Sequence, residues 1–365
     1  MGENSKIEWC HHTFNPWIGC TKVSPGCANC YAEKSTRARV LRSEGHETWG
    51  KGAKRSLTSE ANWKQPLKWN ERTARTRVGI PGNHLVKIGT MDGKVMFTDV
   101  TCPSGGVMPP ADWEALPKFR PRVFCASLSD WLDDEVPIEW LGRLLKLIRD
   151  TPHLDWLLLT KRPQNWQARL HKVSEHLKNQ QQPHAVVDAW LDGHAPANVW
   201  IGTTMEDQTR ADERIPVLLN IPATVRFLSC EPLLSIVDLH SAHIAVETWR
   251  VGESFNGPPP LNGIHWVICG GESGPNARPM HPDWARSLRD QCHAAGVPFF
   301  FKQWGDWVYP AYADPSASFD DFPKAERGQV WQPTSTSRHG YDLLKLGKKK
   351  AGRLLDGIEH NGFPL

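Results

Sequence analysis

The chain has 365 residues, of which 39% are hydrophobic and 23% are charged, so it is long enough to bury a large core. Its formal net charge of +3 is too small to identify a nucleic-acid-binding protein by itself. The sequence contains no run of about 18 apolar residues that could span a bilayer, and the polar N-terminal residues lack the apolar stretch of a secretory signal. We therefore expect a chain without a membrane span or a secretory signal.

The chain contains nine cysteines. An odd number of cysteines in a long chain without a signal argues against a disulfide framework. We therefore expect a reducing, cytoplasmic location, where thiols remain available to bind a metal.

A short strand is predicted near the N-terminus, and it is followed by the loop GCTKVSPGCANCYAE (19–33), which contains Cys20, Cys27 and Cys30. The last two thiols, at C-x2-C spacing, can bind one metal centre, and the first can join them. Structural zinc sites are closed and four-coordinate, so zinc would need a fourth ligand such as Cys10 or His12. A [4Fe–4S] cluster held by only three cysteines keeps one iron open to a small molecule. Both metals remain open on the spacing alone.

Residues 41–120 are rich in Arg, Lys, Gly and Pro, and we interpret them as an insertion after the first helix. Within them, GTMDGKVMF (89–97) predicts a β-hairpin around Asp92-Gly93.

From residue 120 onward, short apolar runs alternate with amphipathic stretches, which is typical of a parallel sheet covered by helices. The runs are VFCASL (123–128), WLLLTK (156–161), VWIGTT (199–204), VRFLSC (225–230), HWVICG (265–270) and PFFFKQ (298–303). Helices are predicted over 137–150, 205–220 and 281–296. Six such strands and the one near the N-terminus predict a full or partial (β/α) TIM-like barrel of about six to seven parallel strands. A doubly wound open sheet is the alternative.

Polar residues follow nearly every apolar run, and in a barrel these positions converge on one mouth, where active sites lie. They include Asp130, Lys161, Thr204, Glu231, Glu272 and Lys302. We place the barrel in residues 1–308 and treat 309–365 as a C-terminal extension. The basic run Lys348–Lys350 within this extension is expected to be a solvated surface.

Several motifs together resemble the three-cysteine-motif family that is common in bacteriophages and prophages and is grouped with radical S-adenosylmethionine (SAM) enzymes. They are NPWIGCTKVSPGCANCYAE (15–33), SLSDWLDDEVP (127–137), LLLTKRP (157–163), VWIGTTMEDQ (199–208), FLSCEPLL (227–234), VICGGESGPNARPM (267–280) and PFFFKQWG (298–305). The resemblance covers residues 6 to 308. It implies a [4Fe–4S] cluster on Cys20, Cys27 and Cys30, with SAM bound at the open iron.

The resemblance also suggests individual roles. Tyr31 is where such enzymes keep a ring near the adenine of SAM, and Asp130 is where a group often meets the SAM amine. The six residues between Cys20 and Cys27 depart from the commonest spacing. The sequence GGESG (270–274) follows a later strand than the usual Gly-Gly-Glu contact, so the role of that contact cannot be transferred by position.

Other candidates rest on the residues themselves. Gly270 and Gly271 would let the backbone approach a ligand, and Glu272 could bind an ammonium group or cap a helix. Lys161 could meet the SAM carboxylate or a substrate phosphate, and Lys302 could do the same. For Glu231 the site and turn interpretations are comparable. The cysteines within the apolar runs, Cys125, Cys230 and Cys269, are expected in the core.

These observations favour a radical SAM enzyme that uses an external electron donor. Its substrate is unknown, and a phage-type setting suggests a nucleic acid, a nucleotide or a host protein. A separate partner protein also fits such a setting. The alternative is a zinc- or cluster-stabilised nucleic-acid-binding barrel without redox catalysis.

Overall fold

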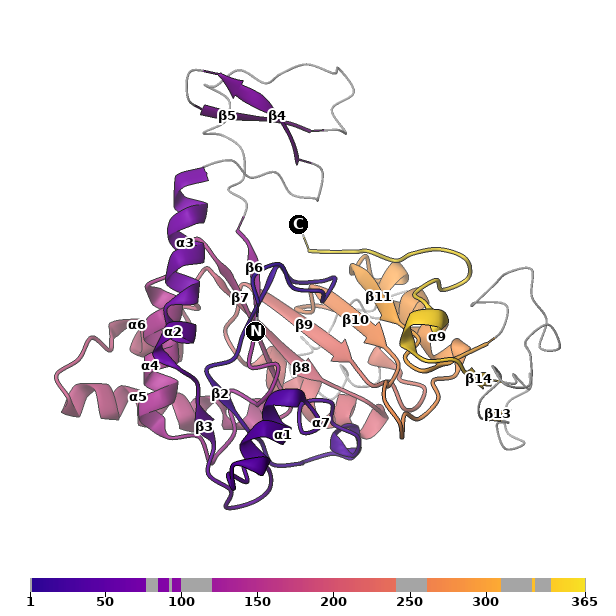
Figure 1. Ribbon diagram of the computed structural model, residues 1–365, viewed down its shortest axis with the longest axis horizontal. Helices are drawn as coiled ribbons and strands as arrows, with labels where there is room; N and C mark the ends of the chain where they lie inside the picture. Colours follow the sequence, from indigo (N-terminus) through magenta and orange to yellow (C-terminus); the bar gives the residue numbers. More distant parts are fainter. Residues whose placement is uncertain are drawn as a thin grey trace, which may run out of the picture.

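The computed structural model describes residues 2–76, 85–91, 94–99, 120–240, 261–309, 330–331 and 343–364. Its main sheet has seven parallel strands whose spatial order follows the chain, so that each strand lies between its predecessor and its successor. They are β1 (His12–Phe14), β6 (Arg122–Cys125), β7 (Asp155–Thr160), β8 (Val199–Thr204), β9 (Val225–Cys230), β10 (Trp266–Gly270) and β11 (Phe299–Gln303). The sheet curls into a half-barrel (Figure 1), which confirms the predicted partial barrel. A doubly wound sheet would instead reverse its strand order.

Helices cover the outer face of this sheet (Figure 1). They are α4 (Ile138–Arg149), α5 (Trp166–Asn179), α6 (Ala185–Leu191), α7 (Gln208–Leu219) and α9 (Pro282–Ala294). The three helices predicted for this region correspond to α4, α7 and α9. Helix α9 ends as its sequence predicts, because Gly296 adopts a φ of +66° just after the helix and donates its N–H to the carbonyl of His293.

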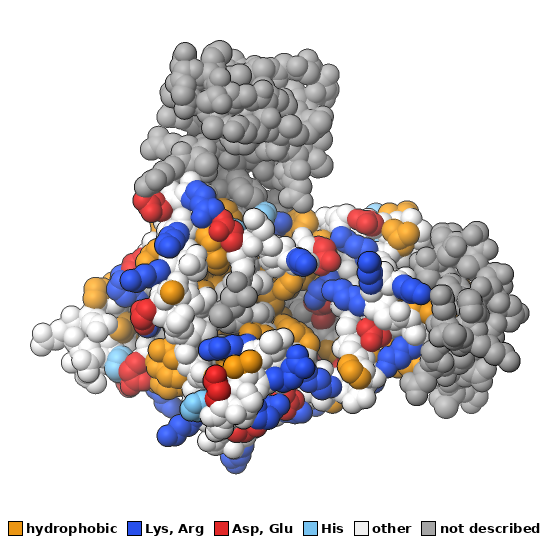
Figure 2. All heavy atoms as spheres, viewed as in Figure 1, with side chains coloured by type: hydrophobic (Ala, Val, Ile, Leu, Met, Phe, Trp, Pro, Cys, Tyr) orange, Lys and Arg blue, Asp and Glu red, His pale blue; other side chains and the backbone are white. Residues whose placement is uncertain are grey.

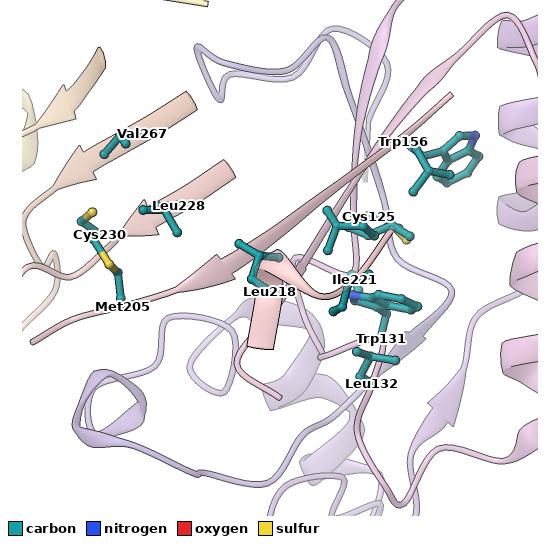
Figure 3. Close-up of a cluster of buried hydrophobic side chains, with 14 of the residues drawn as sticks. Cys125, Trp131, Leu132, Trp156, Met205, Leu218, Ile221, Leu228, Cys230 and Val267 are labelled. Carbon is teal, nitrogen blue, oxygen red and sulfur yellow. The ribbon is translucent and has the colours of Figure 1, made fainter. Parts of the chain in front are cut away.

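Successive residues of each strand point to opposite faces of the sheet, and the two faces bury separate apolar clusters. On β7, Trp156 and Leu158 join the outer cluster beneath the helices, whereas Leu157 joins the inner one. Figure 3 shows part of the outer cluster, in which Leu228 and Cys230 of β9 contribute to the same core as Leu218 of α7. Cys125, Cys230 and Cys269 are fully buried there, which confirms that they are core residues.

The inner face is filled by aromatic side chains that we call the aromatic floor. It consists of Trp9, Phe124, Phe227, Trp266, Phe300 and Phe363. The first and last of these come from the two chain termini. The C-terminal segment lies antiparallel to β11, where Phe300 pairs with Asn361. The indole N–H of Trp266 donates to the carbonyl of Gly362 at 2.7 Å. Both ends of the chain thus complete the interior of the open half-barrel.

Smaller elements flank the sheet. The segment after the cysteine loop forms α1 (Thr36–Ser43), β3 (Ser56–Leu57), α2 (Glu60–Trp63) and α3 (Gln65–Thr76), and β3 pairs with β2 (Trp17–Ile18), which precedes the loop. The predicted hairpin is confirmed by antiparallel pairing of β4 (Leu85–Met91) with β5 (Lys94–Asp99), while its turn at Asp92-Gly93 lies outside the described residues.

The C-terminal region forms a second small sheet from β12 (Trp307–Val308), β13 (Val330–Trp331) and β14 (Leu343–Lys345), followed by α12 (Lys348–Ala351). The rest of residues 310–342 lies outside the described residues. Among the helices that the structure describes, none has the length and apolarity needed to cross a bilayer.

Candidate active site

A cavity of about 440 Å³ lies at the carboxyl ends of the parallel strands, as the polar residues after the strands predict. It is lined by all three cysteines of the loop and by most of the predicted site residues. These are Cys20, Cys27, Cys30, Tyr31, Asp130, Lys161, Thr204, Glu231, Gly271, Glu272 and Lys302. Gly270 does not line it. A side chain at Gly270 would come within 2.7 Å of the Glu231 carboxylate, so this glycine makes room for a protein group and not for a ligand.

The cysteine loop adopts a fixed path over the mouth. Gly19 enters it with a φ of +110°, and any side chain there would collide with Thr48. A single 3₁₀ turn, η1 (Pro25–Cys27), then brings Cys27 inward, and this thiol lies 3.8 Å from the hydroxyl of Ser24. All three loop cysteines are free thiols.

The first anchor of this loop is Arg162, which follows β7 and is 3% exposed. Its guanidinium donates to the carbonyl of Thr21 at 2.6 Å and to the sulfur of Cys20 at 3.5 Å. The same group forms an ion pair with Asp130 at 3.1 Å. Cys20 is therefore the loop cysteine that the structure places against a buried cation.

Asp130 is fully engaged by these neighbours. One carboxylate oxygen accepts from the hydroxyl of Thr160 at 2.7 Å and from the backbone N–H of Leu132 at 3.0 Å. The other accepts from the N–H of Lys161 at 2.9 Å in addition to the Arg162 guanidinium. In this arrangement Asp130 orients Arg162, and neither of its oxygens lacks a partner.

A second buried arginine, Arg55, contacts the same loop residue, Thr21, as Arg162 does. Arg55 pairs with Asp133 at 2.8 Å and donates to the hydroxyl of Thr21 at 2.7 Å. It also donates to the carbonyls of Thr48, Gly50 and Ala53, so it fixes the segment that packs against Gly19. Such multiple donation suits the planar, five-donor arginine and not lysine.

The second anchor is Glu206, which follows β8 and is fully buried. It accepts from the N–H of Gly26 at 2.8 Å and pairs with Arg214 at 3.1 Å. A side chain at Gly26 would lie 3.0 Å from this carboxylate, so the close contact favours glycine. Although burial opposes ionisation, the hydrogen bond from Ser24 and the charges of Lys161 and Arg214 lower the pKa of Glu206.

The third anchor is Glu272, which follows β10. It accepts from the side-chain amide of Asn29 at 3.0 Å and forms a two-pronged ion pair with Arg278. Burial alone would raise the pKa of Glu272, but the hydrogen bonds from Arg278 and Asn29 lower it overall. The cysteine loop is thus tied at three points, each by a carboxylate–arginine pair that follows a different strand.

Glu231 and Lys302 differ from these anchors. They pair with each other at 2.8 Å across β9 and β11, and their side chains are 15% and 18% exposed. Both line the cavity, and the structure shows no hydrogen bond from either to the cysteine loop. This pair therefore faces the cavity without a role in holding the loop.

The remaining predicted residues occupy distinct positions. Tyr31 is 62% exposed and its hydroxyl donates to the carbonyl of Ser127 at 2.8 Å. Thr204 is 1% exposed at the end of β8. Lys161 lines the cavity and forms no ion pair with any residue that the structure describes. Lys348 of α12 also lines the cavity, although the sequence predicts only a solvated surface there.

The fourth-ligand candidates for zinc lie elsewhere. Cys10 is 6% exposed and belongs to the cluster of the aromatic floor, where burial raises the pKa of its thiol to about 11. The ring of His12 stacks on Trp69 with 4.4 Å between ring centroids. Within the described residues, no group of three or more His, Cys, Asp and Glu side chains is arranged to hold a metal ion.

The surroundings of Cys20 favour its protonated thiol. Burial raises the pKa of Cys20 to about 12, and Asp130 adds to this effect while Arg162 opposes it. A bound metal would reverse this preference, because a coordinated thiol loses its proton.

A model of a family of proteins of unknown function (DUF5131) matches residues 4–364. The chain belongs to this family. The match spans the half-barrel, the cysteine loop and the C-terminal segment together. No curated protein and no solved structure matches the chain.

Sequence reasoning did not identify the residues that hold the site. Arg55, Arg214 and Arg278 are remote in sequence from the cysteines that they support, and Asn29 lies in the loop itself, where nothing in its position predicts a bond to Glu272. Glu206 follows a strand as Asp130 and Glu272 do, so the pattern of polar residues after strands predicts its place at the mouth, but not its role in holding the loop.

Proposed function

We propose that this protein is a [4Fe–4S]-dependent radical SAM enzyme that acts on a nucleic acid or a nucleotide. Cys20, Cys27 and Cys30 would hold the cluster, and SAM would bind in the cavity beside it. When bound, this pair of cofactors supplies a 5′-deoxyadenosyl radical from the reductive cleavage of SAM by an external electron donor. The free cysteines among the described residues fit a reducing cytoplasm, where such a cluster persists.

One observation carries the proposal: three thiols on a single loop line one cavity at the mouth of a half-barrel, and three carboxylate–arginine pairs hold that loop. Buried ion pairs contribute little net stability, so this arrangement serves better to fix geometry than to strengthen the fold. The donor set also fits the cluster. A cubane cluster binds each thiolate through a different iron, so its thiols need not meet at one ion.

The charged groups of the cavity that do not hold the loop suit the amino-acid end of SAM. Because the oxygens of Asp130, Glu206 and Glu272 are all engaged with the groups that hold the loop, Glu231 is better able than these three carboxylates to receive an ammonium group. Lys302, beside Glu231, and Lys161, which forms no ion pair within the described part of the chain, can receive a carboxylate. We therefore assign contact with the SAM amine to Glu231 in preference to Asp130, and assign the positioning of Arg162 to Asp130.

Anaerobic reconstitution tests the proposal. We expect about four irons per chain and a broad absorbance near 400 nm. Addition of dithionite and SAM should then release 5′-deoxyadenosine. Glu231→Gln should weaken SAM binding while leaving the iron content unchanged.

The alternative, a zinc-stabilised barrel that binds nucleic acid without redox catalysis, predicts a different composition. Stoichiometric zinc with no iron after anaerobic purification would establish it. The placement of Cys10 in the aromatic floor and of His12 against Trp69 counts against this alternative, because it leaves the loop without either of its expected fourth ligands.

A further inference from the structure

Two short segments of the chain are rich in Lys and Arg and contain no acidic residue. Residues 34–42 contain four Lys and Arg and no acid, and residues 345–353 contain five and no acid. Once these nine are set aside, the rest of the chain has 34 Lys and Arg against 40 Asp and Glu, a net charge of −6. The formal charge of +3 therefore hides an acidic body with two basic segments.

The structure places both segments beside the cavity. Residues 34–42 contain most of α1, which begins shortly after Cys30, and Tyr31 and Ala32 just before this segment line the cavity. The second segment contains α12, whose Lys348 lines the cavity. In the face shown in Figure 2, Lys and Arg side chains gather below the centre, around α1, and to its right, around the C-terminal segment.

Several of these cations are not used by the fold. Lys34, Arg37 and Lys349 are exposed and form no ion pair with any residue that the structure describes. Arg42 does pair with Glu47, at 3.1 Å, and Lys345 donates to the carbonyl of Pro275 and lies over the ring of Trp307. The basic segments therefore offer unpaired cations next to a few that fix the local structure.

The surroundings of Lys348 are unfavourable for its positive charge. Partial burial and the nearby charge of Lys302 lower its pKa, although Glu8 and Glu231 counteract them. Like charges held together beside a cavity are relieved when an anion binds between them. A ligand with several negative charges would relieve the repulsion between Lys348 and Lys302 at the cavity.

We infer that the two basic segments, α1 with Lys34 and residues 345–353, form a docking surface for the phosphodiester backbone of a single-stranded nucleic acid. A strand lying across both segments would bring one of its nucleotides to the mouth. A single strand suits the site better than a duplex, because a base must leave its stack to enter a cavity. Tyr31, 62% exposed, and Val23, 44% exposed, offer the apolar and aromatic contact that unstacked bases prefer.

The inference deepens the proposed function by naming the surface that receives the substrate, but its test does not depend on the cluster. Full-length protein without metal is titrated into a fluorescein-labelled 20-nucleotide strand of mixed sequence, and anisotropy is measured at about 50 and 200 mM salt. Deoxyribose and ribose strands are compared to identify the natural backbone. Repeating the titration after reconstitution should give the same ranking of variants.

Two charge-reversed variants decide the result. Lys348→Glu/Lys349→Glu should raise the Kd about tenfold or more at low salt and reduce the salt dependence. The matched control Lys68→Glu/Lys172→Glu changes the net charge equally on exposed positions of α3 and α5, and it should change the Kd less than about twofold. A second pair on the other segment, Arg37→Glu/Arg39→Glu, should resemble the first.

Three outcomes would overturn the inference. The wild-type protein could fail to bind either strand at low salt, or the control could weaken binding as much as the α12 variant. A polyglutamate of equal charge could also bind as tightly as the strands, which would identify an acidic protein as the partner. Failure to bind a strand in a protein that assembles the cluster would reject the docking surface alone. Strand binding without cluster assembly would instead reject the proposed chemistry.

Discussion

The aromatic floor and the mouth of the half-barrel are built from the same strands but by opposite means, although Trp9 and Phe124 of the floor also line the cavity. At the aromatic floor, Trp266 contacts the rings of Trp9, Phe227, Phe300 and Phe363, and the packing is almost entirely apolar. At the mouth, carboxylates that follow the strands are paired with arginines and hold a loop. Burial of aromatic surface stabilises a fold strongly, whereas buried ion pairs mainly fix geometry.

This difference indicates a division of labour, in which the floor carries stability and the mouth carries the site, as in complete barrels. The division can be tested because each end offers variants that should leave the other end unchanged. If the two ends were equivalent, changes at either one would alter stability and metal content together.

The largest expected effect is at the mouth. Cys27→Ser should reduce iron after reconstitution from about four per chain to less than about one, since a hydroxyl is a poor ligand for a cluster iron. The melting temperature of the metal-free protein should stay nearly constant. Cys125→Ala is the control, because Cys125 is fully buried beneath the helices. It should lower stability and keep the iron, and equal iron in the Cys27 variant would contradict the assignment.

The second-largest effect is expected at the aromatic floor, on the free energy of unfolding. Trp266→Ala should lower the free energy of unfolding by about 3–5 kcal/mol, because it empties the centre of the inner cluster and leaves the carbonyl of Gly362 without its donor. Urea unfolding measures this change. Trp49→Ala is a matched control, since Trp49 lines the cavity at the mouth. We expect it to cost less than about 1.5 kcal/mol, and a larger loss there would show that the mouth also carries stability.

A smaller effect is expected from Arg162→Lys. Lysine keeps the charge but cannot reach the sulfur of Cys20, the carbonyl of Thr21 and Asp130 at once, so stability should fall by about 1–2 kcal/mol. Loss of an N–H···S hydrogen bond should also lower the reduction potential of the reconstituted cluster, on the order of tens of millivolts. A redox titration followed by electron paramagnetic resonance measures this shift.

Arg214→Lys is the control that separates the effect of the hydrogen bond to Cys20 from the general effect of replacing a buried arginine. Arg214 is buried and paired with Glu206 in the same way, but the structure shows no contact between its guanidinium and a cysteine sulfur. This control should leave the potential unchanged. Equal shifts in both variants would mean that Arg162 acts only through the packing of the loop.

The sequence predicted the sheet well and the supports of the site poorly, for a physical reason. Parallel strands buried on both faces are continuous apolar runs, so VWIGTT (199–204) and VRFLSC (225–230) coincide with β8 and β9. The convergence of Asp130, Glu231 and Glu272 followed from the same topology.

What each of these side chains does could not be read from its position. Asp130 and Glu231 both follow strands. Asp130 forms an ion pair with Arg162, whereas Glu231 pairs with Lys302 and faces the cavity. Such partners come from segments far apart in the chain, and the choice among them depends on distances of about an ångström. Helix α5 was missed because its sequence, WQARLHKVSEHLKN, carries many polar residues and follows the strand end without a clear cap.

The smallest effect concerns the pH dependence of stability near the floor. His11 accepts a hydrogen bond from the backbone N–H of Arg122 at 2.9 Å, and burial together with the charge of Arg122 lowers the pKa of His11 to about 4. The unfolded chain has a histidine pKa near 6.5, so between about pH 6.5 and pH 4 the unfolded state binds more protons. This contribution to stability is therefore present above pH 6.5 and is lost as the pH falls toward 4.

His11→Asn tests this contribution, because an amide oxygen can accept the same hydrogen bond without titrating. Between pH 7.5 and pH 5 the wild-type protein should lose about 1–2 kcal/mol more than the variant, measured by urea unfolding at each pH. Iron binding at pH 7.5 should be the same for both proteins, since His11 does not line the cavity. If His11→Asn lost iron while its stability did not change with pH, the floor and the mouth would not be independent of each other.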